Sequence, residues 1–339
     1  MPVGVLGLFE NSVIPAAMIR DRWNVPGVNL ETAIRFRNKI AMKEALRGTS
    51  IRVPRFWKVG RDTSPEVIEQ IAATLPGRVV MKPIDQAASV GVQVFADGAE
   101  FARYARERSV PGDVDVEEFI EGQICMFDGI VRDGVIRFFS ASKYLNSVFD
   151  YRTASAPVAV VTLDDPNLIE RSMSFTQAVL TTLGLHDSSF HLEAFVTATD
   201  EFVFLEAACR FGGAGISAQL KSVYGVDIAD ESIRACLGEP SRLTGRQTML
   251  DRAGVGASGF IWLALEEQRP CVVKQIHGLD VLPDSVLSSD IPNIGQLLNG
   301  SVGVWPSSGK FMLAGPSTSA VEADMTAIAD SYRVDLAIT

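Results

Sequence analysis

The sequence has 339 residues, of which 47% are hydrophobic and 21% are charged, and this length and composition suit a globular protein of two or three lobes. Its 41 acidic residues outnumber its 31 lysines and arginines, and the net charge of −10 argues against general binding to nucleic acids or to anionic membranes. No apolar run approaches the roughly 20 residues that span a bilayer. The start of the sequence lacks the pattern of a secretory leader, and the four cysteines lack the spacing of a disulfide framework or a zinc site. We therefore expect a cytoplasmic protein with reduced thiols.

The first 50 residues predict one strand followed by helices. The apolar run 3–8 predicts a buried strand, and residues 10–23 have helical spacing. Asn29 is placed to cap a second helix that continues to about residue 46.

From residue 54 the sequence alternates between strand and helix patterns. Strands are expected at 56–59, 78–83, 92–95 and 115–120, and helices at 65–74 and 99–108. The Asp133-Gly134 pair predicts a hairpin turn between strands 123–131 and 135–141. Later helices are expected at 167–183, 216–237 and 319–333, and later strands at 190–197, 202–207, 258–265, 271–275 and 311–316.

The hairpin predicted for 190–197 and 202–207 carries two glutamates. If Thr197 lies opposite Phe202, then Glu193 lies opposite Glu206, and such cross-strand pairs have Cβ atoms about 4.5–5.5 Å apart. Two facing carboxylates repel each other unless a cation lies between them, and Mg²⁺ prefers oxygen ligands of this kind. The alternative is an exposed hairpin with two hydrated glutamates. Arg210 continues the face of Glu206 and can hold a phosphoryl group.

Two other features of the sequence are consistent with nucleotide binding. Lys82 ends a buried apolar strand, where a phosphate is a natural partner for an ammonium, and the small residues 87–91 can close their backbone N–H groups over phosphate oxygens or form a plain turn. The acidic stretch 116–122 contains Phe119 and Ile120 and predicts either an adenine-binding hinge or an acidic edge strand. A Walker P-loop, a dinucleotide-binding glycine motif and a nucleophilic serine motif are absent from the sequence.

Taken in order, these motifs resemble those of the ATP-grasp superfamily. The resemblance rests on Lys39, on Lys82 with its loop, on the stretch 117–120, and on Glu193, Glu206 and Arg210-Phe211-Gly212-Gly213. Glu10, Val25-Pro26-Gly27 and Phe36-Arg37-Asn38-Lys39 with Met42-Lys43 are similar to the carboxylate–amine ligases of the L-amino-acid ligase type. The resemblance implies an α+β ATP-grasp fold of two lobes clasping ATP, after a truncated N-terminal region. The expected divisions are an N-terminal remnant (1–50), a small lobe (51–120), a large lobe (121–240) and a strand-rich C-terminal lobe (241–339).

The resemblance also implies a role for particular residues. Lys39 and Lys82 would contact the ATP phosphates, and Ser89 to Gly91 would form the loop over them. Glu117, Glu118 and Ile120 would hold adenine. Glu193 and Glu206 would bind Mg²⁺, with Mn²⁺ as an alternative, and Arg210 together with Lys82 would carry the catalysis.

The resemblance implies an ATP-dependent ligase that joins a small carboxylate, free or carrier-bound, to an amine through an acyl phosphate, with release of ADP and phosphate. Amino-acid or natural-product metabolism is the expected setting, and a homodimer is expected to cover the apolar flank at 3–8. Two departures from the pattern are Ile124, in place of a ribose-binding Glu, and Ala208, in place of a metal-binding Asn. Together with the truncated N-terminal region, they motivate one alternative, a degenerate nucleotide-binding subunit without turnover. A ligase that uses bicarbonate or a purine-pathway acid is another.

Overall fold

The computed structural model describes residues 3–75, 77–108, 110, 112–146, 149, 156–252, 256–300 and 306–339. The chain forms two compact units. Unit 1 comprises Met1–Arg137, Arg171–Phe211 and Ala229–Gly245, and unit 2 comprises Phe138–Glu170, Gly212–Ile228 and Arg246–Thr339. The four-part division expected from the sequence stays a prediction.

Unit 1 begins with three helices, α1 (Val13–Trp23), α2 (Leu30–Arg35) and α3 (Lys39–Leu46). The strand predicted at 3–8 is wrong: the segment joins no sheet, and the carbonyl of Val5 accepts hydrogen bonds from the Arg20 side chain of α1 instead. Asn29 caps α2 as predicted, since its Oδ1 accepts from the amide of Thr32 at 2.8 Å. The single helix expected to continue to residue 46 is two helices, because the Asn38 side chain provides a second N-cap that begins α3.

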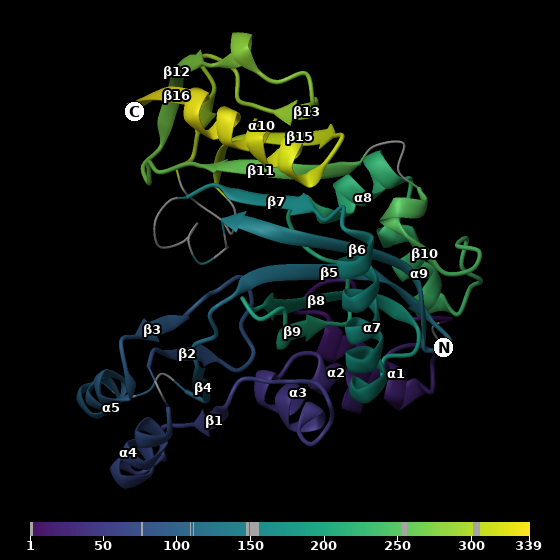
Figure 1. The fold of residues 1–339 in the computed structure, drawn as a ribbon, viewed down its shortest axis with the longest axis vertical. Coiled ribbons are helices and arrows are strands. Elements are labelled where there is room, and N and C mark those ends of the chain that lie inside the picture. The colour runs from purple at the N-terminus through teal and green to yellow at the C-terminus, as the bar shows by residue number, and fades with distance from the viewer. Residues whose placement is uncertain are drawn as a thin grey trace. The chain divides into compact units, whose positions relative to one another are not determined.

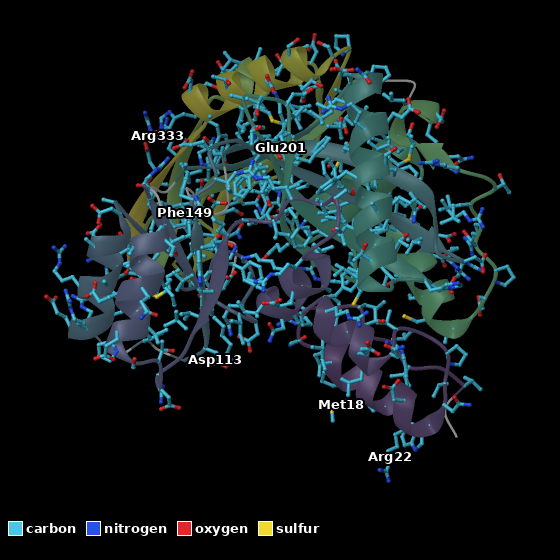
Figure 2. The ribbon with its side chains drawn as sticks, turned by 60° about the horizontal axis from the view of Figure 1, so that its bottom comes forward. Met18, Arg22, Asp113, Phe149, Glu201 and Arg333 are labelled. Atoms are coloured by element: carbon cyan, nitrogen blue, oxygen red, sulfur yellow. The ribbon has the colours of Figure 1, made fainter. Side chains whose placement is uncertain are left out.

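Helix α1 has one buried and one exposed face. Met18 and Arg22 lie on its outer side, where Met18 is 56% exposed (Figure 2). Val13, Ala16 and Ala17 are buried on the other side. The helix is therefore held to the rest of unit 1 by small apolar side chains and by the buried Arg20.

A four-stranded antiparallel sheet in unit 1 has the order β1-β4-β2-β3 (Figure 1). Helices α4 and α5 pack on this sheet around a core that includes Ile68, Val79, Phe101 and Val116. The bounds of β1 and α4 are those predicted, and Ser64 caps α4 ahead of Pro65. The elements are β1 (Phe56–Val59), α4 (Pro65–Thr74), β2 (Val79–Pro83), β3 (Gln93–Phe95), α5 (Gly98–Glu107) and β4 (Val114–Glu118).

Unit 1 also contains an antiparallel set of strands in the order β5-β8-β9. The hairpin turn predicted at Asp133-Gly134 is present, with φ values of 54° and 71°. Gln177 fixes this turn, because its amide group bonds to Gly134 O and to the Ile136 N–H. The elements are β5 (Gln123–Arg132), β6 (Val135–Asn146), which continues into unit 2, α7 (Pro166–Leu183), β8 (Ser188–Val196), β9 (Phe202–Ala208) and α9 (Ile228–Leu237).

Unit 2 contains strands in the order β6-β7-β11-β15-β13 and a separate sheet in the order β14-β12-β16. Helix α10 packs on β11 and β15 through Val321, Met325 and Ile328 (Figure 1). The helix predicted at 216–237 is divided by Gly225, whose φ of 68° ends α8. The elements are β7 (Val158–Thr162), α8 (Ile216–Tyr224), β10 (Gln247–Thr248), β11 (Ala257–Ala264), β12 (Cys271–His277), β13 (Val286–Asp290), β14 (Leu297–Leu298), β15 (Ser307–Gly315), α10 (Thr318–Ser331) and β16 (Arg333–Ile338). Among the described residues, no helix has both the length and the apolar character needed to cross a membrane.

Candidate active site

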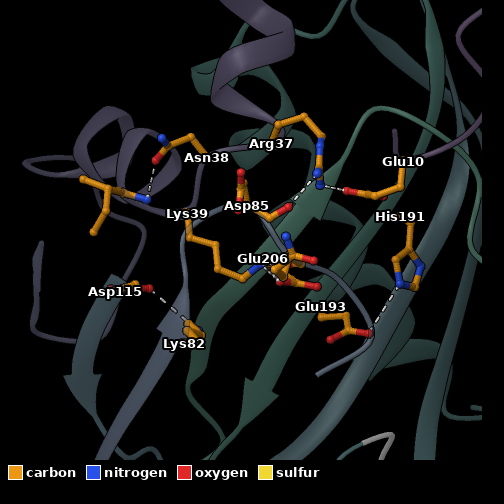
Figure 3. A network of polar contacts seen from close by, with 12 residues as sticks. Glu10, Arg37, Asn38, Lys39, Lys82, Asp85, Asp115, His191, Glu193 and Glu206 are labelled. Atoms are coloured by element: carbon orange, nitrogen blue, oxygen red, sulfur yellow. Dashed lines mark hydrogen bonds and ion pairs between the residues drawn. The ribbon is translucent and has the colours of Figure 1, made fainter. Parts of the chain in front are cut away.

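The start of α3 is joined to the loop that follows β2. Asn38 caps the helix and so places Lys39 in its first turn, with the Lys39 amide donating to Ile84 O. The Lys39 ammonium donates to Gln86 O at 2.6 Å and lies 2.9 Å from Glu206 Oε2 (Figure 3). The helix start and the loop therefore lie together beside the carboxylate of β9.

Glu193 of β8 lies directly opposite Glu206 of β9, as predicted. The register from which this was inferred is wrong, however, because Val196 and not Thr197 lies opposite Phe202. The register shifts between Ala194 and Glu193, where one extra residue of β9 forms a bulge. The bulge cancels the one-residue error and brings the two glutamates face to face.

Each of the two facing glutamates is paired with a cation of the protein. Burial opposes the charge of Glu206, but Lys39, together with Lys82 and His191, outweighs the effect of burial and lowers the pKa of that carboxyl to about 2. His191 lies between two carboxylates, with Nδ1 2.9 Å from Asp128 Oδ1 and Nε2 3.4 Å from Glu193 Oε1. Burial disfavours the imidazolium, yet Asp128 and Glu193 together raise the pKa of His191 to about 10. His191 is thus a buried group that is hydrogen-bonded to Asp128 and lies close to Glu193.

A second group of charges is buried between α3, β2 and β4. The Lys43 side chain is fully enclosed and donates to the carboxylates of Asp115 and Glu117. Lys82 lies 2.6 Å from Glu117 Oε1 and 3.9 Å from Asp115 Oδ2. Two ammonium groups therefore balance two carboxylates in a site with almost no contact with water.

The pKa values of this buried group follow its contacts. Burial disfavours the Lys82 ammonium, but Glu117 and Asp115 outweigh it and raise its pKa. Burial likewise opposes the charge of Glu117, and Lys43 and Lys82 lower the pKa of that carboxyl. For Asp115 burial prevails and the pKa is raised, which fits the lack of a hydrogen-bond partner at its Oδ1.

The structure separates the two glutamates of the acidic stretch. Glu117 and Asp115 point to one face of β4, whereas the Glu118 carboxylate bonds to the backbone N–H and the side chain of Arg55 at 3.0 and 3.1 Å. Any contact of Glu118 with a base would therefore use its backbone and not its carboxylate. Ile120 is buried just beyond β4, while the ring of Phe119 lies 3.6 Å from the guanidinium of Arg78.

The loop with Ser89 and Gly91 is a tight turn. Ala88, Ser89 and Gly91 have φ values of 55°, 54° and 74°, in the left-handed region that side chains other than glycine rarely adopt. The amides of Val90 and Val92 donate within the loop, to Ala87 O and Ser89 O. The predicted plain turn and the predicted phosphate loop are both compatible with this geometry.

Arg210 follows β9 and is held by two acceptors. Its side chain donates to the Glu10 carboxylate and, at 2.7 Å, to Phe211 O. Glu10 also binds Arg37, so that one carboxylate holds two guanidinium groups. A pocket in unit 1 is lined by residues from positions 10–42, from the loop after β2, from β8, and from β9 with Arg210 after it. The lining residues are Glu10, Phe36, Arg37, Lys39, Met42, Gln86, Ala87, His191, Glu206, Ala207, Ala208 and Arg210.

The carboxylates of Glu193 and Glu206 fit a divalent cation. They offer hard oxygen donors from facing positions. In this structure Lys39 lies on Glu206 and His191 lies beside Glu193, so a bound cation would compete with these two side chains. Ala208 lies opposite His191 and supplies no donor. Among the described residues, the three-residue group with metal-ligand spacing is Asp133, His186 and Asp187, which surrounds an exposed turn and is balanced by Arg132 and Arg137.

Two members of the site were not assigned from the sequence. Lys43 was noted only as part of a motif, and Asp115 only as the start of a strand. The alternation of Asp115 and Glu117 along β4 was the available signal, because residues two apart share a face of a strand.

No family model matches the sequence. The L-arginine-specific L-amino acid ligase of Bacillus subtilis is 24% identical over 250 residues, which are 71% of this chain and 59% of that protein. The L-amino acid ligase of Bacillus licheniformis has a solved structure that superposes with a TM-score of 0.73 at 17% identity, covering 98% of this chain and 80% of that one. The chain has the ATP-grasp fold. The biotin carboxylase domain of Hydrogenobacter thermophilus 2-oxoglutarate carboxylase, solved with MgADP and bicarbonate, also superposes, with a TM-score of 0.71 at 15% identity over 96% of this chain and 72% of that one.

This ATP-grasp chain resembles carboxylate–amine ligases of the L-amino-acid ligase type in sequence. It spans less than two thirds of the length of the first curated relatives that it matches, between 51% and 59%. The superpositions confirm the predicted α+β ATP-grasp fold.

Proposed function

We propose that the protein is an ATP-dependent carboxylate–amine ligase that forms an amide or peptide bond with release of ADP and phosphate. The observation that carries the proposal is the facing pair Glu193 and Glu206, with the Lys39 ammonium on Glu206 and with Arg210 in the pocket that Lys39 and Glu206 line. Facing carboxylates, lysines and an arginine in one place suit the transfer of a phosphoryl group, in which positioning and electrostatics supply most of the catalysis. The resemblance to amino-acid ligases supports an amino acid as one substrate.

The proposed reaction has two steps. A carboxylate oxygen of the first substrate attacks the γ-phosphorus of ATP, the bond from that phosphorus to the β–γ bridging oxygen breaks, and ADP leaves. The nitrogen of the second substrate then attacks the acyl carbon, the carbon–oxygen bond to phosphate breaks, and the amine proton passes to phosphate or solvent. Each step moves negative charge onto oxygens that need cationic neighbours.

The residues of this chain would divide that work. Lys39 and Lys82 would bind phosphate oxygens, and residues 89–91 would cover them. Glu117, the backbone of Glu118 and the side chain of Ile120 would hold adenine. Arg210 would stabilise the negative charge of the acyl phosphate and of the adduct formed from it.

Glu193 and Glu206 would hold Mg²⁺, or Mn²⁺ in its place, which when bound draws negative charge from the nucleotide phosphates. The biotin carboxylase domain was solved with MgADP, which supports magnesium over other cations. The Lys39 ammonium now lies on Glu206, so it would have to leave that oxygen before a cation took its place.

The test is release of ADP and phosphate from purified protein offered a panel of carboxylates with a panel of amines. We expect release only when both substrates are present. AMP and pyrophosphate as products would contradict the acyl-phosphate route. Nucleotide binding without turnover over a broad panel would identify the degenerate subunit, and turnover with bicarbonate or a purine-pathway acid would identify the other alternative.

Four further expectations belong to this proposal: carrier-bound substrates, a homodimer, the four-part domain division and a cytoplasmic location. The need for ATP and the free cysteines Cys125, Cys209, Cys236 and Cys271 support the last of these. Light scattering of the purified protein would give its oligomeric state, and limited proteolysis would give its domain boundaries.

A further inference from the structure

The buried group of charges between α3, β2 and β4 includes a lysine that has no role in the proposed reaction. Lys43 comes from α3, one helical turn after Lys39, and donates to both Asp115 and Glu117. We propose that Lys43 is a positioning residue for the nucleotide: it holds the Glu117 carboxylate in place when Lys82 turns from that carboxylate to the phosphates. The inference rests on the proposed function, since it assumes that Lys82 binds phosphate and that Glu117 binds the base.

Only one of the two lysines is placed to leave. Lys82 touches Glu117 but stands 3.9 Å from Asp115, and its charge also acts on Glu206 of β9. Its charge therefore acts both on the acids of β4 and on one of the facing glutamates. The Lys43 side chain has no exposed surface and forms ion pairs with both Asp115 and Glu117. Its ammonium also lies 5.3 Å from the centre of the Phe56 ring.

The balance of charge explains why a second lysine is needed. Two ammonium groups and two carboxylates make the site neutral while Lys82 is present. If Lys82 left and Lys43 were absent, Asp115 and Glu117 would be two buried acids without a cation. A buried carboxylate without a cation takes up a proton or moves, and either change would disrupt the contact between Glu117 and the base.

The test is a charge-balanced double variant, Lys43→Met with Asp115→Asn. It removes one charge of each sign and leaves Lys82 and Glu117 as a neutral pair, so the free protein keeps a paired site. The matched control is Lys58→Met with Asp113→Asn. This pair also joins β1 to the start of β4, at 2.6 Å, but both side chains are about half exposed (Figure 2 labels Asp113).

Binding of MgATP is measured by calorimetry in buffers of different ionisation enthalpy, with the melting temperature as the check on folding. We expect the control to bind like the wild type. We expect the double variant to bind at least about tenfold more weakly and to take up about one more proton per nucleotide. The extra proton lies on Glu117, which has no cation beside it once Lys82 has left, because both substituted side chains are uncharged. Since the bound state carries this proton, the affinity of the double variant falls as the pH rises.

Wild-type affinity and proton count in the double variant would overturn the proposal, and so would weaker binding without the extra proton. If the double variant does not fold, a crystal structure of the wild type with MgADP decides: Lys43 must remain on Glu117 while Lys82 contacts phosphate, and the reverse arrangement overturns the proposal. A wild type that binds MgATP but lacks ligase turnover would refute the proposed function alone. A wild type that binds no nucleotide would refute both.

Discussion

The Lys39 ammonium lies 2.9 Å from Oε2 of Glu206, and both residues line the same pocket. An ammonium on that oxygen takes the place of a metal cation there. Phosphates that attract Lys39 would free the oxygen for a cation, and a bound cation would in turn release Lys39. Metal and nucleotide should therefore each strengthen the binding of the other.

We expect Lys39→Met to separate these two effects. Without the ammonium, Glu206 is free, and Mn²⁺ should bind about tenfold more tightly in the absence of nucleotide, whereas MgATP should bind at least about tenfold more weakly. Electron paramagnetic resonance of free Mn²⁺ measures the first effect and calorimetry the second. Lys58→Met, a change of the same size on an exposed lysine, should move neither. Unchanged Mn²⁺ binding in Lys39→Met would show that the ion pair does not compete with the metal.

We expect Glu206→Gln to reduce turnover by a factor of at least about 100, because the amide keeps the shape of the side chain but removes the charge that a divalent cation needs. The rate of ADP release is the measurement. The control is Glu201→Gln in the loop between β8 and β9, whose carboxylate pairs with Arg52 and is 46% exposed. Near-normal turnover in Glu206→Gln would mean that the metal assignment is wrong.

The elements with local signals were predicted well, and those that depend on distant partners were not. The cap at Ser64 and the proline after it set the start of α4, and the turn at Asp133-Gly134 set the hairpin of β5 and β6. Strands β7, β10, β13, β14 and β16 were not predicted. A short strand gains most of its stability from the neighbour it pairs with, as β16 does from β12, and that neighbour is not visible in its own sequence.

Prediction of the site from the sequence was limited in the same way, by contacts between residues that are distant in the chain. The pairing of Glu193 with Glu206 was predicted correctly because the bulge in β9 cancelled a one-residue error in the register at the turn. No local sequence pattern predicts that bulge. Lys43 was missed for another reason. A lysine on an amphipathic helix is ordinarily exposed, and only Asp115 and Glu117, more than 70 positions later in the sequence, make its burial favourable.

The pKa of His191 predicts how stability depends on pH. Its folded pKa, about 10, lies above the ordinary value of 6.5, so the charged ring stabilises the fold fully below about pH 6.5 and this contribution is lost as the pH rises toward 10. We expect urea unfolding of the wild type to show a decline in stability over that window, on the order of a few kcal/mol.

His191→Gln should flatten this decline and should lower stability at pH 7 by roughly 3–5 kcal/mol, since the buried Asp128 loses its cation. The control is His186→Gln, whose ring is largely exposed beside Asp187 and whose loss should change stability little. An equal decline with pH in His191→Gln and in the wild type would assign the titration to another group.

The packing of α5 on α4 depends on a glycine. Gly98 begins α5 and is buried, and a Cβ atom there would meet the backbone carbonyl of Ala72 in α4. Alanine has the higher helix propensity, by about 1 kcal/mol at most, but a clash with backbone cannot be relieved by turning a side chain and costs roughly 1–3 kcal/mol. The clash should prevail, so we expect Gly98→Ala to lower the free energy of unfolding by about 1–2 kcal/mol in urea. Gly112→Ala is the control, because a Cβ at Gly112 meets no atom within 4 Å, and a loss in the control equal to that in Gly98→Ala would refute the steric explanation.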